Sequence, residues 1–435
     1  MTQTGGAGHS PEQVAAAVRA SYAAFVGAGF AFASWASRIP QVRARLQLNP
    51  AELGLVLLAI AAGSVIALPI SGLVVHRLGT CRTVTVMAVL LAAALAVVAA
   101  GYLAGVVPVL IGLFVLGFAN GSWDVAMNVQ GAEVERHLGK AIMARFHAGF
   151  SLGTVAGALL GAAMVGLQIA VTVHLIAVAI IVAVAVPALV RRFLPDATTT
   201  GDATTTRDAT TRDATAPRVE AAGGGEAVTP PGSDRASSVF GRWRERRTLL
   251  VGVFVLAFAF SEGTGSDWIG VALIDGRHAP AVVGTLGFAA FLAAMTAARW
   301  AGPHLLERHG RVAVVRALAL VAVLGLIVFV FSPNIPLAFV GALLWGAGTS
   351  LGFPVGMSAA ADEPAAAAGR VSVVASVGYC AFLGGPPLIG FLGSHLGVLH
   401  ALIAVAVLLA VASTLAASLR PLPSTTGRQP TPAGG

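Results

Sequence analysis

Residues 53–75 read LGLVLLAIAAGSVIALPISGLVV, a run of 23 residues that contains no charged side chain. About 20 apolar residues in a helix cross the hydrocarbon core of a bilayer, and a chain inside lipid must satisfy its backbone hydrogen bonds internally. The run therefore predicts a transmembrane α-helix. Similar apolar blocks occupy residues 14–36, 84–103 and 107–129, so this helix is one of a series.

The composition of the whole chain also indicates a membrane protein. Of its 435 residues, 57% are hydrophobic and 11% are charged, whereas soluble domains carry about 25% charged residues. Twelve apolar segments predict an all-α membrane protein with twelve transmembrane helices. We expect the first, residues 15–37, to remain uncleaved, because its apolar block is too long for a signal peptide.

Basic residues are divided unequally between the loops on the two predicted sides of the membrane. One set of alternate loops holds 23 of the 27 Lys and Arg residues, Arg299 included, and the other holds Arg38, Arg43, Arg45 and Arg277. Because basic loops stay in the cytoplasm, we expect both termini there. The preference for Arg over Lys is typical of GC-rich bacterial genomes, so the expected location is a bacterial inner membrane. The net charge of +8 then reflects topology and not a nucleic-acid partner.

A polar segment divides the chain into two parts. Residues 191–247 contain Asp-Ala-Thr-Thr repeats, three successive glycines and ten arginines, a composition that cannot form a core and predicts a disordered cytoplasmic linker. We therefore expect an N-terminal six-helix bundle at residues 1–190 and a C-terminal six-helix bundle at residues 248–420. Residues 421–435 would form a cytoplasmic tail.

The two predicted bundles carry matching motifs. Residues 77–79 recur as residues 308–310, and Arg145 recurs as Arg370, each followed by a glycine at equal spacing. Matches of this kind keep the same order, at offsets between 225 and 231 residues, across four helix pairs. Parallel repeats of six helices place a substrate site between the halves, near the middle of the membrane.

The loop after the second predicted helix resembles the Gly-x-x-x-Asp-Arg-x-Gly signature of the major facilitator superfamily. The residues of this loop are Gly72, His76, Arg77, Gly79 and Arg82, and those of its second copy are Glu307, Arg308 and Gly310. The resemblance extends over the chain except its termini and linker. It implies the major facilitator fold, with these loops acting as a conformational latch. His76 stands where the superfamily usually has Asp, which removes the acidic partner from the first loop.

Three further stretches resemble one bacterial branch of this superfamily. They are residues 32–40, 145–153 and 262–268. The branch includes membrane proteins associated with rhizopine, an inositol derivative, so the resemblance implies a small polar solute.

Few ionisable residues lie inside the predicted helices, where a charge costs about 2.5 kcal/mol or more. Glu262 lies near the middle of the predicted helix 248–272, and it is either a proton-coupling carboxylate or a structural hydrogen-bond partner. Asp267 lies nearer to the outer face. It is a candidate for proton coupling or substrate binding, or for an ion pair with Arg38, itself a candidate cavity residue, that holds an outer gate.

Three polar residues recur every four positions along the fourth predicted helix: Asn120, Asp124 and Asn128. This spacing puts them on one helix face. We expect this face to line the substrate cavity, with Asp124 as a second proton site, or to hydrogen-bond to neighbouring helices. The same helix lacks the Arg that many proton-coupled drug exporters of the superfamily carry, which disfavours drug efflux.

The remaining candidates have equally open roles. Trp35 and Trp268 either stack on a substrate or pack inside the bundle, and His147 either assists proton coupling or stays at the headgroups. A row of glycines on the fifth predicted helix predicts close contact with a neighbouring helix: Gly153, Gly157 and Gly161.

The sequence carries no motif for nucleotide binding, zinc-protease or serine-hydrolase chemistry, and Cys81 and Cys380 have no metal or disulfide spacing. We expect no cofactor, metal, ATP or enzymatic activity. The prediction is a secondary active transporter that moves a small solute, preferably sugar- or polyol-like, by alternating access with proton coupling. Two alternatives remain open: an efflux antiporter for drugs or metabolites, and a membrane sensor or scaffold that does not transport.

Overall fold

The computed structural model describes residues 10–140, 142–195, 241–363 and 366–421. Within them the chain forms helices and no strands, and twelve helical segments are long and apolar enough to cross a membrane. The predicted all-α fold with twelve spans is therefore confirmed. The predicted linker and tail lie mostly outside the described residues.

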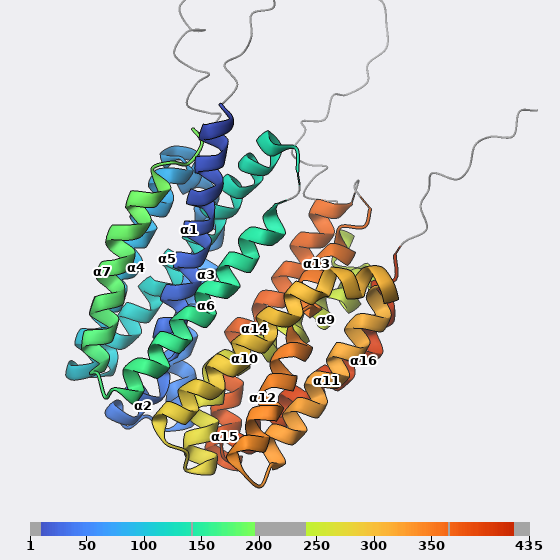
Figure 1. Cartoon of the computed structure of the whole chain (residues 1–435). Helices are drawn as coiled ribbons and strands as arrows, with labels where there is room; N and C mark the ends of the chain where they lie inside the picture. Colours follow the sequence, from blue (N-terminus) through green and yellow to red (C-terminus); the bar gives the residue numbers. More distant parts are fainter. Residues whose placement is uncertain (1–9, 141, 196–240, 364–365, 422–435) are drawn as a thin grey trace, which may run out of the picture.

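Six spans form the N-terminal half (Figure 1). The first is made of α1 (Pro11–Ala36) and the short α2 (Ile39–Leu46). The other five are α3 (Pro50–Leu78), α4 (Thr80–Ala104), α5 (Val106–Leu138), α6 (Met143–Gly166) and α7 (Val171–Val190).

Six spans also form the C-terminal half. Two of them are composite, because the tenth span comprises α12 and α13 and the twelfth comprises α15, α16 and a final 3₁₀ turn, η1. In chain order the elements are α9 (Arg246–Arg277), α10 (Ala281–His309), α11 (Arg311–Phe331), α12 (Ile335–Thr349), α13 (Gly352–Ala360), α14 (Ala367–Leu396), α15 (Val398–Ala401), α16 (Ile403–Leu415) and η1 (Ala416–Leu419).

Local sequence explains where several helices begin. Asn49 accepts a hydrogen bond from the backbone N–H of Glu52 at 2.9 Å, and the Glu52 carboxylate accepts one from the Asn49 N–H at 2.8 Å. This reciprocal capping satisfies two N–H groups that a helix start would otherwise leave unpaired, and Pro50 supplies a φ suited to the first helical position. Ser10 and Gln13 form the same arrangement at α1.

Matching backbone conformations confirm that the halves are repeats. Gly79 and Gly310 end α3 and α10 with φ of 79° and 76°, and Gln47 and His278 have φ of 55° and 51°. The members of each pair lie 231 residues apart. Helix packing repeats as well, since α1 packs on α6 and α4 on α7 in the first half, as α9 packs on α14 and α11 on α16 in the second.

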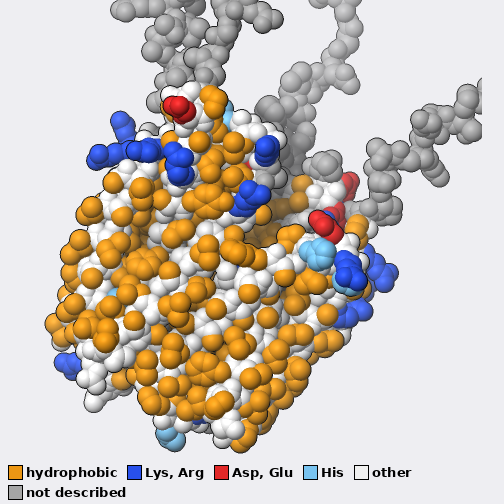
Figure 2. Space-filling model, in the orientation of Figure 1, with side chains coloured by type: hydrophobic (Ala, Val, Ile, Leu, Met, Phe, Trp, Pro, Cys, Tyr) orange, Lys and Arg blue, Asp and Glu red, His pale blue; other side chains and the backbone are white. Residues whose placement is uncertain are grey.

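The ends of the molecule differ in charge. The beginning of α1 and the end of α16 lie at one end, called here the terminal end, and α2 and α15 lie at the opposite end, called the α2 end (Figure 1). Figure 2 shows Lys and Arg gathered at the terminal end, with apolar side chains covering much of the wall below it. This apolar surface suits contact with lipid tails.

The glycine row on α6 allows two helices to meet backbone to backbone, as its spacing predicted. A Cβ added to Gly153 would overlap the carbonyl oxygen of Val26, and one added to Gly157 would lie 2.5 Å from the carbonyl oxygen of Phe30. Both carbonyls belong to α1. Close approach of this kind provides the dispersion contacts that join helices in lipid.

We expect Gly153→Ala to destabilise the protein, because the added methyl group would push α1 and α6 apart, at a cost of about 1–3 kcal/mol for overpacking. Thermal unfolding in detergent measures the change. Gly72→Ala on α3 is the control, since a Cβ there meets nothing within 4 Å and Ala is about 1 kcal/mol better than Gly in a helix. Equal melting temperatures for the two variants would contradict this packing.

An ion-pair network joins neighbouring segments of the C-terminal half at the terminal end. Glu245, which directly precedes α9, accepts hydrogen bonds from Arg370 at 2.7 Å and Thr248 at 2.8 Å and pairs with Arg242. Burial raises the pKa of the Glu245 carboxyl, but these hydrogen bonds outweigh burial and lower its pKa from 4.5 to about 2. A lowered pKa means that the ionised carboxylate stabilises the fold.

Glu245→Gln should therefore lower the melting temperature at pH 7 by about 2–4 °C, the shift expected for the loss of about 1 kcal/mol. Because the folded pKa is lowered, the stabilisation is complete above pH 4.5 and disappears as the pH falls from 4.5 to about 2. Melting curves of both proteins over this range should converge at low pH. A difference in melting temperature between the two proteins that stays constant over this pH range would rule out the ionised carboxylate as its cause.

Candidate solute cavity between the two halves

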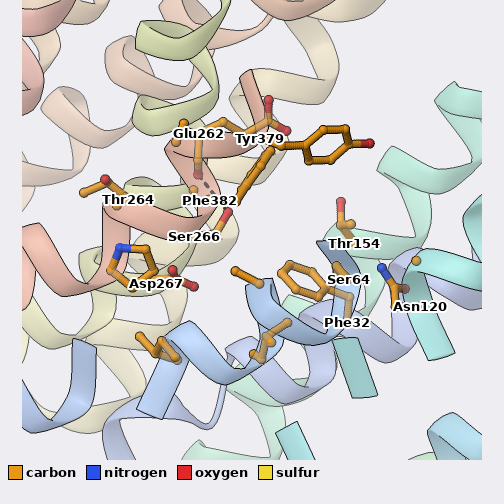
Figure 3. A pocket seen from close by; sticks show the side chains of 18 of the residues that line it. Phe32, Ser64, Asn120, Thr154, Glu262, Thr264, Ser266, Asp267, Tyr379 and Phe382 are labelled. Carbon is orange, nitrogen blue, oxygen red and sulfur yellow. Dashed lines mark hydrogen bonds between the residues drawn. The ribbon is translucent and has the colours of Figure 1, made fainter. Parts of the chain in front are cut away.

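The two halves enclose a cavity of about 300 Å³. Helices α1, α3, α5 and α6 line it from the N-terminal half, and α9, α10 and α14 line it from the C-terminal half. Figure 3 shows the two sets of side chains on opposite sides: Phe32, Ser64, Asn120 and Thr154 from the first half, and Glu262, Thr264, Ser266, Asp267, Tyr379 and Phe382 from the second. The volume suits a small solute.

An ion pair lies in the wall of this cavity. One guanidinium nitrogen of Arg299, Nη2, donates to both carboxylate oxygens of Glu262, at 2.9 and 3.0 Å. Each side chain keeps about a quarter of its surface exposed. Glu262 lies near the middle of the 32-residue α9, so the pair occupies the central part of the span. Two opposite charges at this depth compensate each other's desolvation.

The position predicted for Arg299 is wrong in one respect. The charge distribution counted it on the cytoplasmic side, at the end of a helix predicted over residues 280–301, but α10 continues to His309 and places Arg299 deeper within the helix. The error has a physical cause, since the end of the apolar run was taken as the end of the helix. In the structure the polar turns after Arg299 extend α10 beyond its apolar part.

Arg299 also reaches the neighbouring helices. Its Nε donates to the carbonyl oxygen of Ser350 at 3.1 Å, at the end of α12, and its Nη1 lies 3.4 Å from Ser151 Oγ on α6. Ser151 belongs to the other half. The guanidinium therefore joins the Glu262 carboxylate to the interface between the halves.

The polar face of α5 turns partly towards the cavity. Asn120 and Asp124 both line it, whereas Asn128 donates through Nδ2 to the Asp124 carboxylate at 3.2 Å and to the Asp124 carbonyl oxygen at 2.8 Å. The side-chain oxygen of Asn120 is buried and has no hydrogen-bond partner within the described chain. Asn128 thus orients Asp124, and the other two side chains offer acceptors to the cavity.

Asp267 lies at the boundary between the cavity and a second, much smaller void of about 10 Å³, which Ser37 and Thr285 also line. No ion pair holds Asp267 within the part of the chain that the structure describes. The predicted pairing with Arg38 is wrong, because Arg38 is buried and donates to His174 Nδ1 at 2.9 Å and to the Ile169 carbonyl oxygen at 3.1 Å.

Three other sequence candidates lie away from the cavity lining. Trp35 and Trp268 are 1% and 0% exposed and pack inside the helices. The His147 ring packs edge to face against the Phe25 ring, with their centroids 5.1 Å apart. In contrast, sequence reasoning missed Tyr379 and Phe382, which line the cavity from α14, because aromatic residues in a membrane helix are too common to mark a cavity.

The latch loops lie at the terminal ends of α3 and α10. The side chains of His76, Arg77, Arg82, Glu307 and Arg308 are exposed, and the structure records no ion pair for them within its described ranges. Their role as a latch stays a prediction. At the start of α11, Arg311 instead pairs with Asp362 at 2.5 Å, and Asp362 also accepts from Arg247 at 2.8 Å.

Contacts between the halves concentrate at the α2 end. Arg43 on α2 forms an ion pair with Asp275 on α9. A Cβ on Gly390 of α14 would lie 2.5 Å from the carbonyl oxygen of Pro50 on α3, so these two backbones meet. At the terminal end, by contrast, Figure 2 shows the surface hollowed between the halves.

Comparison with known proteins identifies the family. A sequence profile described as the Major Facilitator Superfamily matches residues 20–381, which is most of the chain. The chain belongs to the major facilitator superfamily. The resemblance seen in the latch loops is thereby confirmed, and the family and its curated members are transporters.

Relatives of this superfamily member support the predicted branch. An uncharacterised transporter, y4wD of Sinorhizobium fredii, is 33% identical over 378 residues, covering 85% of this chain and 89% of its own. The membrane protein MosC of Rhizobium meliloti is 28% identical over 390 residues, with coverage of 88% and 86%. Among solved structures, the nucleoside transporter NupG aligns with a TM-score of 0.69 at 12% identity, over 93% of this chain and 98% of its own. Its similarity shows the fold alone.

We expect Arg299→Gln to destabilise the protein more than the double variant Glu262→Gln/Arg299→Gln. The single change leaves a carboxylate without its counter-ion in the membrane, and the double change removes both charges. Melting temperatures of the wild type, both single variants and the double variant form a thermodynamic cycle, with an expected coupling of about 0.5–3 kcal/mol. Strictly additive effects would show that the two side chains do not stabilise each other.

Proposed function

We propose that this protein is a secondary active transporter that moves a small polar solute through the cavity by alternating access. The observation that carries the proposal is the cavity itself: both halves line it, they meet at the α2 end, and the surface is hollowed at the terminal end. Rocking of two repeated bundles about such a site exposes it to each side in turn.

The orientation follows from the basic residues. Lys and Arg gather at the terminal end (Figure 2), and loops rich in them stay in the cytoplasm. We therefore place the terminal end, with both chain termini, in the cytoplasm of a bacterial inner membrane. In this orientation the structure corresponds to an inward-facing conformation, with the α2 end closed towards the outside.

The carboxylates provide sites for proton coupling. Asp124 and Asp267 line the cavity without a basic partner in the described chain, so a proton can neutralise either of them. Glu262 differs because Arg299 already neutralises it. Its proposed contribution is conformational, since Arg299 joins Glu262 to Ser151 of the opposite half and a change in the pair would alter that contact.

The lining suits a polar solute with an apolar face. Hydroxyl groups of Ser64, Thr154 and Ser266 and the Asn120 amide offer hydrogen bonds, and the rings of Phe32, Phe150, Phe288, Tyr379 and Phe382 offer flat apolar surfaces. A ring-shaped polyol or sugar has both kinds of surface. A few placed polar groups within apolar walls are typical of small-molecule sites.

The test of this proposal is transport by the purified protein in proteoliposomes. A panel of sugars, polyols, amines and nucleosides is offered with and without an imposed pH gradient, and uptake or exchange is measured. We expect flux that depends on the gradient and that Glu262→Gln lowers at least about tenfold, because one altered contact of about 1.4 kcal/mol has that effect on a rate. Glu12→Gln, at the exposed start of α1, is the matched control. Gradient-dependent flux unchanged in Glu262→Gln would reject the role of the pair in coupling.

Asp275→Asn should shift the protein towards its outward-facing conformation, because it removes the ion pair with Arg43 that joins the halves at the closed end. A cysteine at Ser64, in the cavity, reports the shift through its reaction with a membrane-impermeant thiol reagent added outside whole cells. We expect faster labelling in Asp275→Asn, by a factor of about 2–5 for a pair worth up to 1 kcal/mol. Glu52→Gln, on the N-terminal turn of α3, serves as control. Unchanged labelling would mean that this pair does not hold the gate.

A further inference from the structure

The cavity contains more negative than positive side chains. Arg299 is the one Lys or Arg among its described lining residues, and both oxygens of Glu262 accept from it. Asp124 and Asp267 also line the cavity, and neither forms an ion pair with a described Lys, Arg or His. The cavity therefore presents two carboxylates that no cation of the described chain neutralises.

Hydrogen bonding shows the same excess of acceptors. The Asp124 carboxylate accepts from Asn128 Nδ2 at 3.2 Å, and no second side-chain donor is recorded for it in the described chain. One turn earlier on the same face of α5, the buried side-chain oxygen of Asn120 has no hydrogen-bond partner among the described residues. Tyr379 of α14 lines the same cavity as Asp124 from the opposite half. The acceptors of α5 thus face an aromatic side chain of the opposite half.

We propose that the cargo carries a positive charge, such as a protonated amino group, and that Asp124 and Asp267 are its counter-ions in the cavity. This inference rests on the proposed function, because it takes the cavity as the cargo site. An ammonium group has three donors and no acceptor, which matches unpaired carboxylates and a free amide oxygen. The Tyr379 and Phe382 rings add a surface that attracts cations.

Cargoes of other charge fit less well. An anion would meet the carboxylates of Asp124, Asp267 and Glu262, while Arg299 is already engaged by Glu262. A neutral solute would leave two unpaired charges inside the membrane unless each took up a proton. A cationic cargo replaces those protons, so cargo and protons compete, and binding should weaken as the pH falls.

The electrostatic part of the proposal can be measured without knowing the cargo. In a background with Cys81→Ser and Cys380→Ser, a single cysteine replaces Ser64, which lines the cavity. Its reaction rates with a trimethylammonium and a sulfonate methanethiosulfonate reagent are each divided by the rate with free 2-mercaptoethanol. We expect the normalised cation-to-anion ratio to be at least about tenfold higher than at a cysteine replacing Ser394, since focused fields raise local ion concentrations by 10-fold or more. Ser394 is exposed near the end of α14 and lies outside the cavity lining.

Neutralising the proposed counter-ions should remove this preference. Asp124→Asn and Asp267→Asn should each lower the ratio at position 64, and together they should bring it near the value at position 394. The control is Glu52→Gln, which removes a carboxylate outside the cavity lining and should leave the ratio high. A ratio at position 64 no higher than at position 394 would overturn the proposal.

Matched solutes test the cargo itself. Glucosamine, glucose and glucuronate share a ring and differ in charge, as do cyclohexylamine and cyclohexanol. Proteoliposome flux should be greatest for the amine of each set, should weaken at low pH, and should fall at least tenfold in Asp124→Asn/Asp267→Asn. Equal or greater flux of the neutral or anionic member would overturn the charge assignment and leave transport established. Absence of flux for every solute, with the thiol preference intact, would count against the proposed transport and not against the negative cavity.

Discussion

The absence of water inside a bilayer is the constraint on which the rest of this structure depends. It requires the backbone to satisfy its polar groups internally, which a helix does within each span, and it makes every side-chain charge within the spans expensive. Helix formation by itself satisfies the hydrogen-bonding groups of the backbone. The charges are satisfied in three different ways, by a partner in the same half as for Glu262, by a backbone carbonyl as for Arg38, or by turning towards the cavity as for Asp124.

The same constraint also determines how long the apolar runs are and which residues share a helix face. Much of the fold could therefore be predicted from the sequence. Apolar run lengths predict the number of spans, and the four-residue glycine spacing of α6 predicts its contact with α1, which the structure confirms. The polar spacing of α5 puts Asn120 and Asp124 on one face, and both line the cavity, whereas Asn128 of the same face does not. These predictions succeed because helical periodicity turns sequence spacing directly into position.

The site was harder to predict, because its partners are far apart in sequence. Arg299 lies 37 residues from Glu262, and no spacing rule joins two residues on different helices. Hydropathy also misplaced Arg299, since a helix can continue after its apolar run ends. Arg38 illustrates the same difficulty, because its partner is His174 on α7 and not Asp267, the acid at a similar depth. Contacts between helices depend on packing, which a single sequence does not contain.

The repeated halves are alike in backbone but differ in charge. The turns at Gly79 and Gly310 match closely, yet α9 carries Glu262 and Asp267 within its span, whereas α1 has no charged residue after Arg19. The halves are parallel repeats related by an axis along the membrane normal, so two identical halves would contribute equally to each conformation of the protein. Divergence of the charged positions has broken that equivalence. A substitution in one half can therefore change the charge of the cavity without a matching change in the other half, while the shared backbone pattern of the two halves is kept.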